Sequence, residues 1–199
     1  LEWRTLPISS GETSLDDKIA EERFGNQRQM AGQAVRFIDI PADAGTGFGL
    51  FDHAPELPEK PGGGSAKDRG SDLAQTLKAA SSTCFGTAGP AFVTALIENR
   101  EAALARARNV IATFSQRHAS GADGQVQRVA QTFGLIAAAG ELAAVFKVVP
   151  WKVGAATEAA AQCFRAWLNN RGSTGASEIE DAICLLRTTL ERDAARFQK

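Results

Sequence analysis

The chain has 199 residues, of which 44% are hydrophobic, enough for one globular domain or two small ones. Its 22 basic and 23 acidic residues give a formal net charge of −1, so no overall field favours nucleic acid, a membrane surface or an acidic substrate. The N-terminal residues lack the basic and apolar regions of a secretion signal, and no apolar run reaches the roughly 20 residues that span a bilayer.

The three cysteines, Cys84, Cys163 and Cys184, are widely spaced and form no CxxC or Cys/His metal-ligand pattern. Reduced thiols in apolar helical segments behave as small hydrophobic residues. We therefore expect a reducing, cytoplasmic location. Because no apolar run is long enough to span a bilayer, we also expect no membrane partner.

The N-terminal part has the pattern of an α/β fold. Residues 3–8 are predicted to form a strand that ends in a turn, and Ser14 and Asp17 have capping-box spacing for a short helix to about residue 22. Residues 34–40 are predicted to form a second strand, which Pro41 ends. Its apolar residues fall on both faces, as in a sheet covered on both sides.

Beyond this part the pattern is helical. Residues 52–70 are rich in Pro, Gly and charge and are predicted to form a surface loop or linker. About five helices follow, over residues 71–85, 90–118, 125–147, 154–171 and from 177 onward. The helix over 125–147 is apolar nearly all round and should lie at the centre of the core. The last helix should bury the face that carries Ile179, Ile183, Leu186 and Leu190.

The predicted fold is therefore mainly α with a small β portion, the remnant of an α/β sheet followed by a helical domain. Its predicted parts are a sheet-containing region over 1–51, a linker over 52–70 and a helical domain over 71–199. The chain opens within a predicted strand and has no initiating Met, so we expect a fragment. Unpaired strand edges should either be covered by the helices or form a homo-oligomer.

Several motifs have only weak chemical signatures. The glycines of residues 42–49 match neither a phosphate-binding loop nor a dinucleotide fingerprint. Asp39 and Asp43 are expected to accept hydrogen bonds from nearby backbone amides rather than to act as a catalytic pair. His53 and His118 have no second ligand at metal spacing, so no metal site is predicted.

The arginines leave alternatives open. Arg36 lies in an apolar predicted strand, where it either contacts a phosphate or forms a structural salt bridge to Asp39, Asp43 or Glu12. Arg106, Arg108 and Arg117 belong to a locally basic helical segment, which is either a nucleic-acid-binding surface or an ordinary solvated face.

Five segments carry a family resemblance. They are SSGETSLDDKIAE at 9–21, AGQAVRFIDIPADAGTGFGLF at 31–51, FGTAGPAF at 85–92, RVAQTFGLIAAAGELA at 128–143 and PWKVGAATEAAAQCFRAWLNNRG at 150–172. With them the chain resembles the C-terminal part of the domain of unknown function 927 family, helicase-like bacterial proteins often linked to mobile elements. Around 53–70 the sequence departs from that family.

The resemblance implies a C-terminal fragment of a helicase-like or replication-associated P-loop ATPase. The phosphate loop and metal-binding acid would lie in a missing upstream region, so ATP and Mg are implied only for the full-length protein and no cofactor for this fragment. By analogy with such ATPases, Ser9, Ser10 and Glu12 occupy a polar sensor region, and Arg36 is a candidate arginine finger. The alternative is a non-enzymatic helical module that binds DNA or a partner protein.

Overall fold

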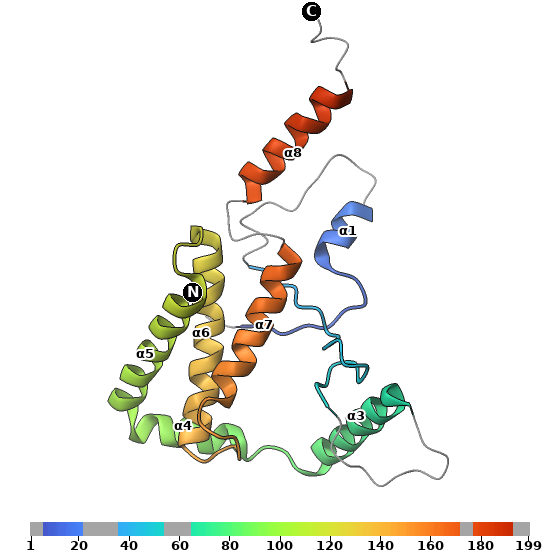
Figure 1. Ribbon diagram of the computed structural model, residues 1–199. Coiled ribbons are helices and arrows are strands. Elements are labelled where there is room, and N and C mark those ends of the chain that lie inside the picture. Colours follow the sequence, from blue (N-terminus) through green and yellow to red (C-terminus); the bar gives the residue numbers. More distant parts are fainter. Residues whose placement is uncertain (1–5, 22–35, 54–64, 172–176, 193–199) are drawn as a thin grey trace, which may run out of the picture. The chain divides into compact units, whose positions relative to one another are not determined.

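The computed structural model describes residues 6–21, 36–53, 65–171 and 177–192. Their helices are α1 (Leu15–Glu21), α3 (Ala66–Thr83), α4 (Ala88–Glu98), α5 (Arg100–Ala119), α6 (Gly124–Val145), α7 (Ala155–Arg171) and α8 (Ser177–Arg192) (Figure 1). The chain divides into two compact units, one formed by Leu1–Asp39 with Ala176–Lys199 and the other by Ile40–Gly175. The prediction of a mainly helical protein is confirmed. The division at residues 52–70 into separate domains stays a prediction.

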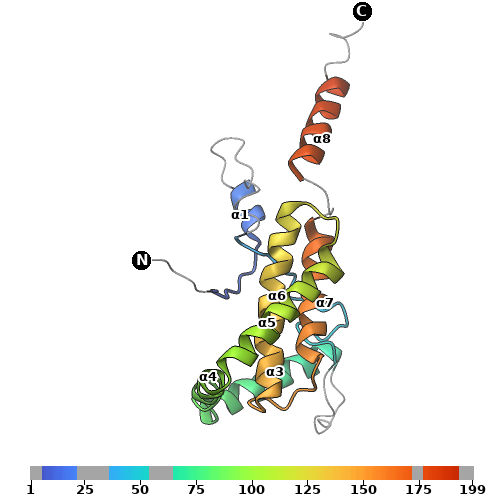
Figure 2. The ribbon, with the colours of Figure 1, turned by 90° about the vertical axis from the view of Figure 1, so that its left-hand side faces the viewer.

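The core of the larger unit is a bundle of α5, α6 and α7. The two views in Figures 1 and 2 show these helices side by side, and α6 contacts both neighbours extensively. Its core contains large apolar side chains from all three helices, namely Phe114, Val126, Val129, Phe133, Phe164 and Trp167. The central position predicted for the helix over 125–147 is confirmed. The helix is not buried on every side, since Leu135 and Ile136 are 53% and 42% exposed.

The long helix predicted over 90–118 is two helices, because Asn99 interrupts it. The amide of Asn99 donates to the carbonyl of Ala95 at 3.1 Å, and its side-chain Nδ2 donates to the same oxygen at 3.0 Å. The carbonyl of Asn99 then accepts from Ala103 and opens α5. Such local side-chain bonds compete with helix continuation, which explains a break that the apolar pattern does not show.

Helix α3 begins earlier than predicted. Ser65, not Ser71, is its N-cap, and it forms a capping box in which the Asp68 amide donates to Ser65 Oγ at 3.2 Å. The Asp68 carboxylate accepts from the Ser65 amide at 2.9 Å. Gly70 fits here because a Cβ would lie 2.4 Å from the carbonyl oxygen of Phe48. Residues 66–70 of the predicted linker are therefore helical.

The predicted strands are not formed in the described parts of their ranges. Residues 6–8 and 36–40 have irregular, turn or bend backbone, and residues 3–5, 34 and 35 lie outside the described residues. A strand is stable only when it pairs with a neighbour, and apolar content alone does not supply one. The described β structure is a single antiparallel bridge between Phe48 and Phe51.

In the smaller unit, α1 has the predicted start. The amide of Asp17 donates to Ser14 Oγ at 3.0 Å, which confirms the predicted cap. The carboxylate of Asp39 accepts from the amide of Leu15 at 3.0 Å and so satisfies a second donor of the first turn. Helix α8 begins at Ser177 as predicted, and its apolar side chains are considered below.

Candidate functional site

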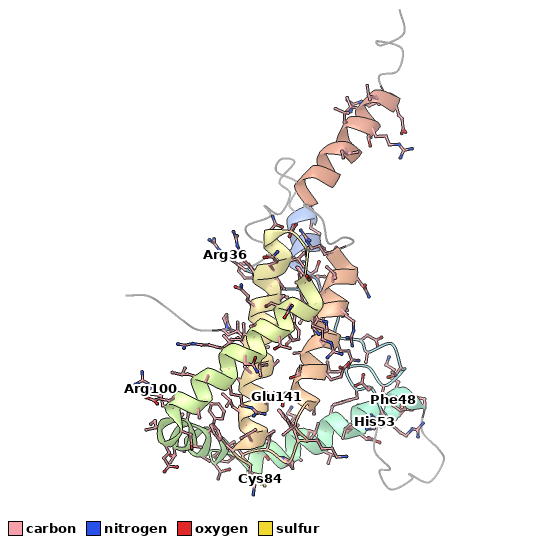
Figure 3. All side chains as sticks on the ribbon, turned by 60° about the vertical axis from the view of Figure 1, so that its left-hand side comes forward. Arg36, Phe48, His53, Cys84, Arg100 and Glu141 are labelled. Atoms are coloured by element: carbon pink, nitrogen blue, oxygen red, sulfur yellow. The ribbon has the colours of Figure 1, made fainter. Side chains whose placement is uncertain are left out.

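A buried carboxylate joins the middle and last helices of the bundle. Glu141 of α6 is only 3% exposed and is labelled in Figure 3. Its Oε2 accepts from the amide of Gly154 at 2.8 Å, and its Oε1 accepts from the amide and hydroxyl of Thr157, each at 3.0 Å. Glu141 therefore caps the N-terminus of α7 from a different helix, where the helix dipole also favours a negative charge.

The environment of Glu141 keeps it ionised. Burial alone would raise its pKa, but the amide of Gly154 and the amide and hydroxyl of Thr157, followed by the positive charge of Arg106, lower it below its usual value. A stabilised carboxylate of this kind contributes to folding through its hydrogen bonds. Its lone pairs are already used by the start of α7, so its geometry is that of a structural clamp.

A second polar clamp lies where α6 begins and α7 ends. Asp123 is the N-cap of α6, and its Oδ1 accepts from the amides of Gln125 and Val126. Its Oδ2 accepts from Arg171 of α7 at 3.0 Å, with the two side chains only 16% and 10% exposed. Burial raises the pKa of Asp123, and the Val126 amide and Arg171 lower it to below its usual value. The guanidinium also lies 5.8 Å from the ring centre of Trp167.

Close backbone approach between the helices depends on glycines of α6. A Cβ on Gly140 would lie 2.5 Å from the Cβ of Ala156 in α7. A Cβ on Gly134 would lie 3.1 Å from the Cα of Ile111 in α5. At these two positions the missing side chain lets the backbones of neighbouring helices approach closely.

His118 belongs to an aromatic cluster at the end of α5. Its ring centre lies 4.6 Å from that of Phe114 and 6.3 Å from that of Phe164. Burial lowers the pKa of His118, and the positive charges of Arg117 and Arg165 lower it further. Among the described residues, no three His, Cys, Asp or Glu side chains are grouped as metal ligands would be.

The three predicted nucleic-acid-binding arginines are all exposed on α5, but they do not share one side. At about 100° per residue, Arg106 and Arg117 differ by only about 20° around the helix, and they are about 17 Å apart along it. Arg108 lies about 160–180° away from both. The structure therefore places two of the predicted residues together and separates the third.

The predicted sensor residues Ser9, Ser10 and Glu12 lie in exposed, irregular backbone before α1. Arg36, labelled in Figure 3, is also exposed. Within the described ranges no hydrogen bond or ion pair joins any of these residues to Arg36. In the described part of the chain, Arg36 forms none of the salt bridges considered for it. Asp39 instead accepts from the amide of Leu15 at the start of α1, and Asp43 accepts from the amide of Gly45 at 2.9 Å.

The glycine-rich loop after Asp43 is held by its own backbone. Gly45, Gly47 and Gly49 all have positive φ, a conformation that glycine adopts without strain. The amide of Ala44 donates to the carbonyl of Gly49 at 2.8 Å, and Thr46 Oγ1 donates to the carbonyl of Phe51. The expected local role of Asp43 is confirmed. The loop packs on α3, where the Arg69 guanidinium lies 5.3 Å from the ring centre of Phe48.

Among the described helices, none is by itself long and apolar enough to cross a membrane. The segments Lys67–Thr83 and Ala88–Glu98 satisfy the length and composition test only as a pair, which is bent by 70°.

Sequence reasoning missed the two clamps. Asp123 precedes a helical pattern, a recognisable N-cap signal, and Glu141 is the one acidic residue within a long apolar run. Their partners, Arg171 and Thr157, follow only from the pairing of α6 with α7. In comparisons with known proteins, no family model, curated protein or solved structure matches the chain.

Proposed function

We propose that this chain is the helical C-terminal part of a helicase-like, replication-associated ATPase, and that it acts by contacting DNA through one side of α5. The observation that supports it best is the placement of Arg106 and Arg117. Both residues are exposed, and helix geometry places them on the same side of one helix of the clamped bundle. Two cations at fixed separation suit contacts with a phosphate backbone.

A second basic side chain, Arg165, lies near the same part of α5, because its charge acts on His118 together with that of Arg117. His118, which follows Arg117 in the chain, has a pKa lowered by burial and then by Arg117 and Arg165. The opposing effect of Glu158 is smaller, although this carboxylate accepts from Arg165 at 3.0 Å. The sequence resemblance to helicase-like proteins supports DNA as the source of the phosphates.

The test compares arginines on opposite sides of α5. We expect the double variant Arg106→Gln/Arg117→Gln to bind a labelled DNA duplex more weakly than the parent. A plot of log affinity against log salt concentration should lose about 1.8 in slope, since each lost phosphate contact removes about 0.9. Fluorescence anisotropy over a range of salt concentrations measures both quantities.

Arg108→Gln is compared with the single variants Arg106→Gln and Arg117→Gln, because each of the three removes one positive charge and only Arg108 lies on the opposite side of the helix. Arg108→Gln should leave the salt slope close to that of the parent. A slope loss of about 0.9 with Arg108→Gln, half that of the double variant, would assign binding to total charge, and a parent protein without DNA affinity would contradict the proposal. Circular dichroism checks that each variant keeps its helical content.

Arg36 supports a second candidate role, as an arginine finger that reaches the nucleotide of a neighbouring subunit. It is exposed, and the described residues offer it no ion pair. A planar, doubly donating guanidinium suits the transition state of phosphoryl transfer, and an ammonium group does not replace it. The ATP, Mg and phosphate loop would come from the upstream region that the resemblance implies.

In a full-length protein with that region, Arg36→Lys should lower ATP turnover by about tenfold or more without weakening ATP binding. Steady-state turnover and nucleotide titration separate the two effects. Turnover unchanged in Arg36→Lys would exclude the finger role, and robust turnover by the 199-residue chain alone would contradict the assignment of an upstream catalytic region.

A further inference from the structure

Helix α8 exposes a stripe of large apolar side chains. Ile183, Leu186 and Leu190 are 61%, 64% and 45% exposed, although the sequence pattern predicted a buried face. With Ile179, which the sequence places one turn earlier, they define the α8 stripe. Several adjacent large apolar groups in water are costly, at about 25 cal/mol for each Å² that could be buried.

The spacing of the stripe is that of a two-stranded coiled coil. Steps of four, three and four residues separate Ile179, Ile183, Leu186 and Leu190, which places them at positions d, a, d and a of a heptad. A repeat of 3.5 residues keeps such a stripe facing one partner helix along its length. A helix that packs on a broad globular core more often has a wider apolar face.

The charges beside the stripe distinguish the possible partners. In this register Glu180 and Arg187 both occupy position e, whereas both g positions are uncharged, Ala182 and Thr189. In an antiparallel pair of identical helices, e positions lie opposite e positions, so Glu180 of each copy faces Arg187 of the other. A parallel pair would place each charge opposite an uncharged g residue.

We propose that α8 forms an antiparallel pair with α8 of a second copy of this chain. Ile183 of one copy then packs against Leu186 of the other, and Ile179 against Leu190. Two-fold symmetry forms each contact twice, including the two Glu180–Arg187 pairs. Within its own helix Arg187 bonds Glu191 at 3.3 Å with both side chains largely exposed, a contact weak enough to be replaced.

The inference does not depend on the proposed function. It places the contact between copies on a helix, whereas the sequence predicted a contact through edge strands. Sixteen residues span only about 24 Å and little more than two heptads, so the dimer should be weak and concentration-dependent. Sedimentation velocity of the 199-residue chain should show a monomer at low concentration and a dimer at high concentration. A chain that stays monomeric throughout would overturn the proposal.

Leu186→Glu tests the stripe. It should weaken dimerisation by at least about a hundredfold, because each dimer loses two buried leucines and gains two unpaired charges. The control is Thr188→Glu, which adds the same charge to the same helix at the f position, facing away from the stripe. Equal effects of the two variants on dimerisation, or no effect of Leu186→Glu, would contradict the proposed pairing of α8.

Charge exchange tests the orientation. Glu180→Arg and Arg187→Glu should each dimerise more weakly than the parent, because like charges then face each other. A mixture of the two single variants should form a heterodimer more readily than either variant forms a homodimer, since every e–e contact is again between opposite charges. Association of the parent without this preference in the mixture would exclude the antiparallel pair and assign the stripe to another contact.

Discussion

Replacement of Glu141 by Gln is expected to lower the free energy of unfolding by about 3–4 kcal/mol at neutral pH. The carboxylate accepts three hydrogen bonds at the start of α7 while it is 3% exposed. Gln keeps the shape, but its single oxygen cannot accept all three, and its NH₂ group would face a donor. A buried donor left without a partner costs about 1–3 kcal/mol, and bonds to a charged acceptor are the stronger kind.

Urea unfolding followed by circular dichroism measures this loss. Thr157→Val removes only the hydroxyl donor and should cost about 1 kcal/mol, which places it between the parent and Glu141→Gln. Glu98→Gln removes an exposed carboxylate from α4 and should change stability by less than about 0.5 kcal/mol. A Glu141→Gln protein as stable as Glu98→Gln would show that α7 does not need this acceptor.

The cost of Glu141→Gln should also depend on pH. The pKa of Glu141 is lowered in the folded protein, so its contribution is complete above the ordinary value of 4.5 and is lost as pH falls through the lower, folded value. Below that pH both proteins carry a neutral side chain at this position. The two unfolding free energies should therefore converge in acid and differ most near pH 7.

The helices of the bundle could be predicted from local signals, but their interruptions and polar contacts could not. The apolar stripe of residues 155–171 and the start at Ser177 follow from spacing and capping residues, and the structure has both. The break at Asn99 depends on a side-chain bond to Ala95 that leaves the apolar period unchanged. The period of the apolar residues therefore predicts where helices form better than it predicts where they end.

The candidate site shows the same division. Helical geometry alone separates Arg108 from Arg106 and Arg117, so that distinction was available from the sequence. The partners of Glu141 lie 13 and 16 residues away at the start of another helix, and only the packing of α6 against α7 brings them together. The predicted strand over 34–40 depends in the same way on neighbours that its own sequence does not specify.

Replacement of Gly140 by Ala is expected to destabilise the protein by about 2–3 kcal/mol, although Ala favours helix by up to about 1 kcal/mol over Gly. The new methyl group would lie 2.5 Å from the Cβ of Ala156, and neither group is the end of a flexible side chain. Relief requires α7 to move away from α6. That movement would also lengthen the hydrogen bonds of Glu141 to the start of α7.

Two further variants separate this overlap from other effects of the substitution. Gly124→Ala, in the same helix with no atom within 4 Å of the new Cβ, should be neutral or slightly stabilising. Gly134→Ala, with a 3.1 Å approach to Ile111, should be intermediate. The double variant Gly140→Ala/Ala156→Gly removes the opposing methyl and should recover most of the lost stability. Recovery of stability would show that the contact between residues 140 and 156 sets the spacing of α6 and α7. A double variant as unstable as Gly140→Ala would show that this contact does not set the spacing.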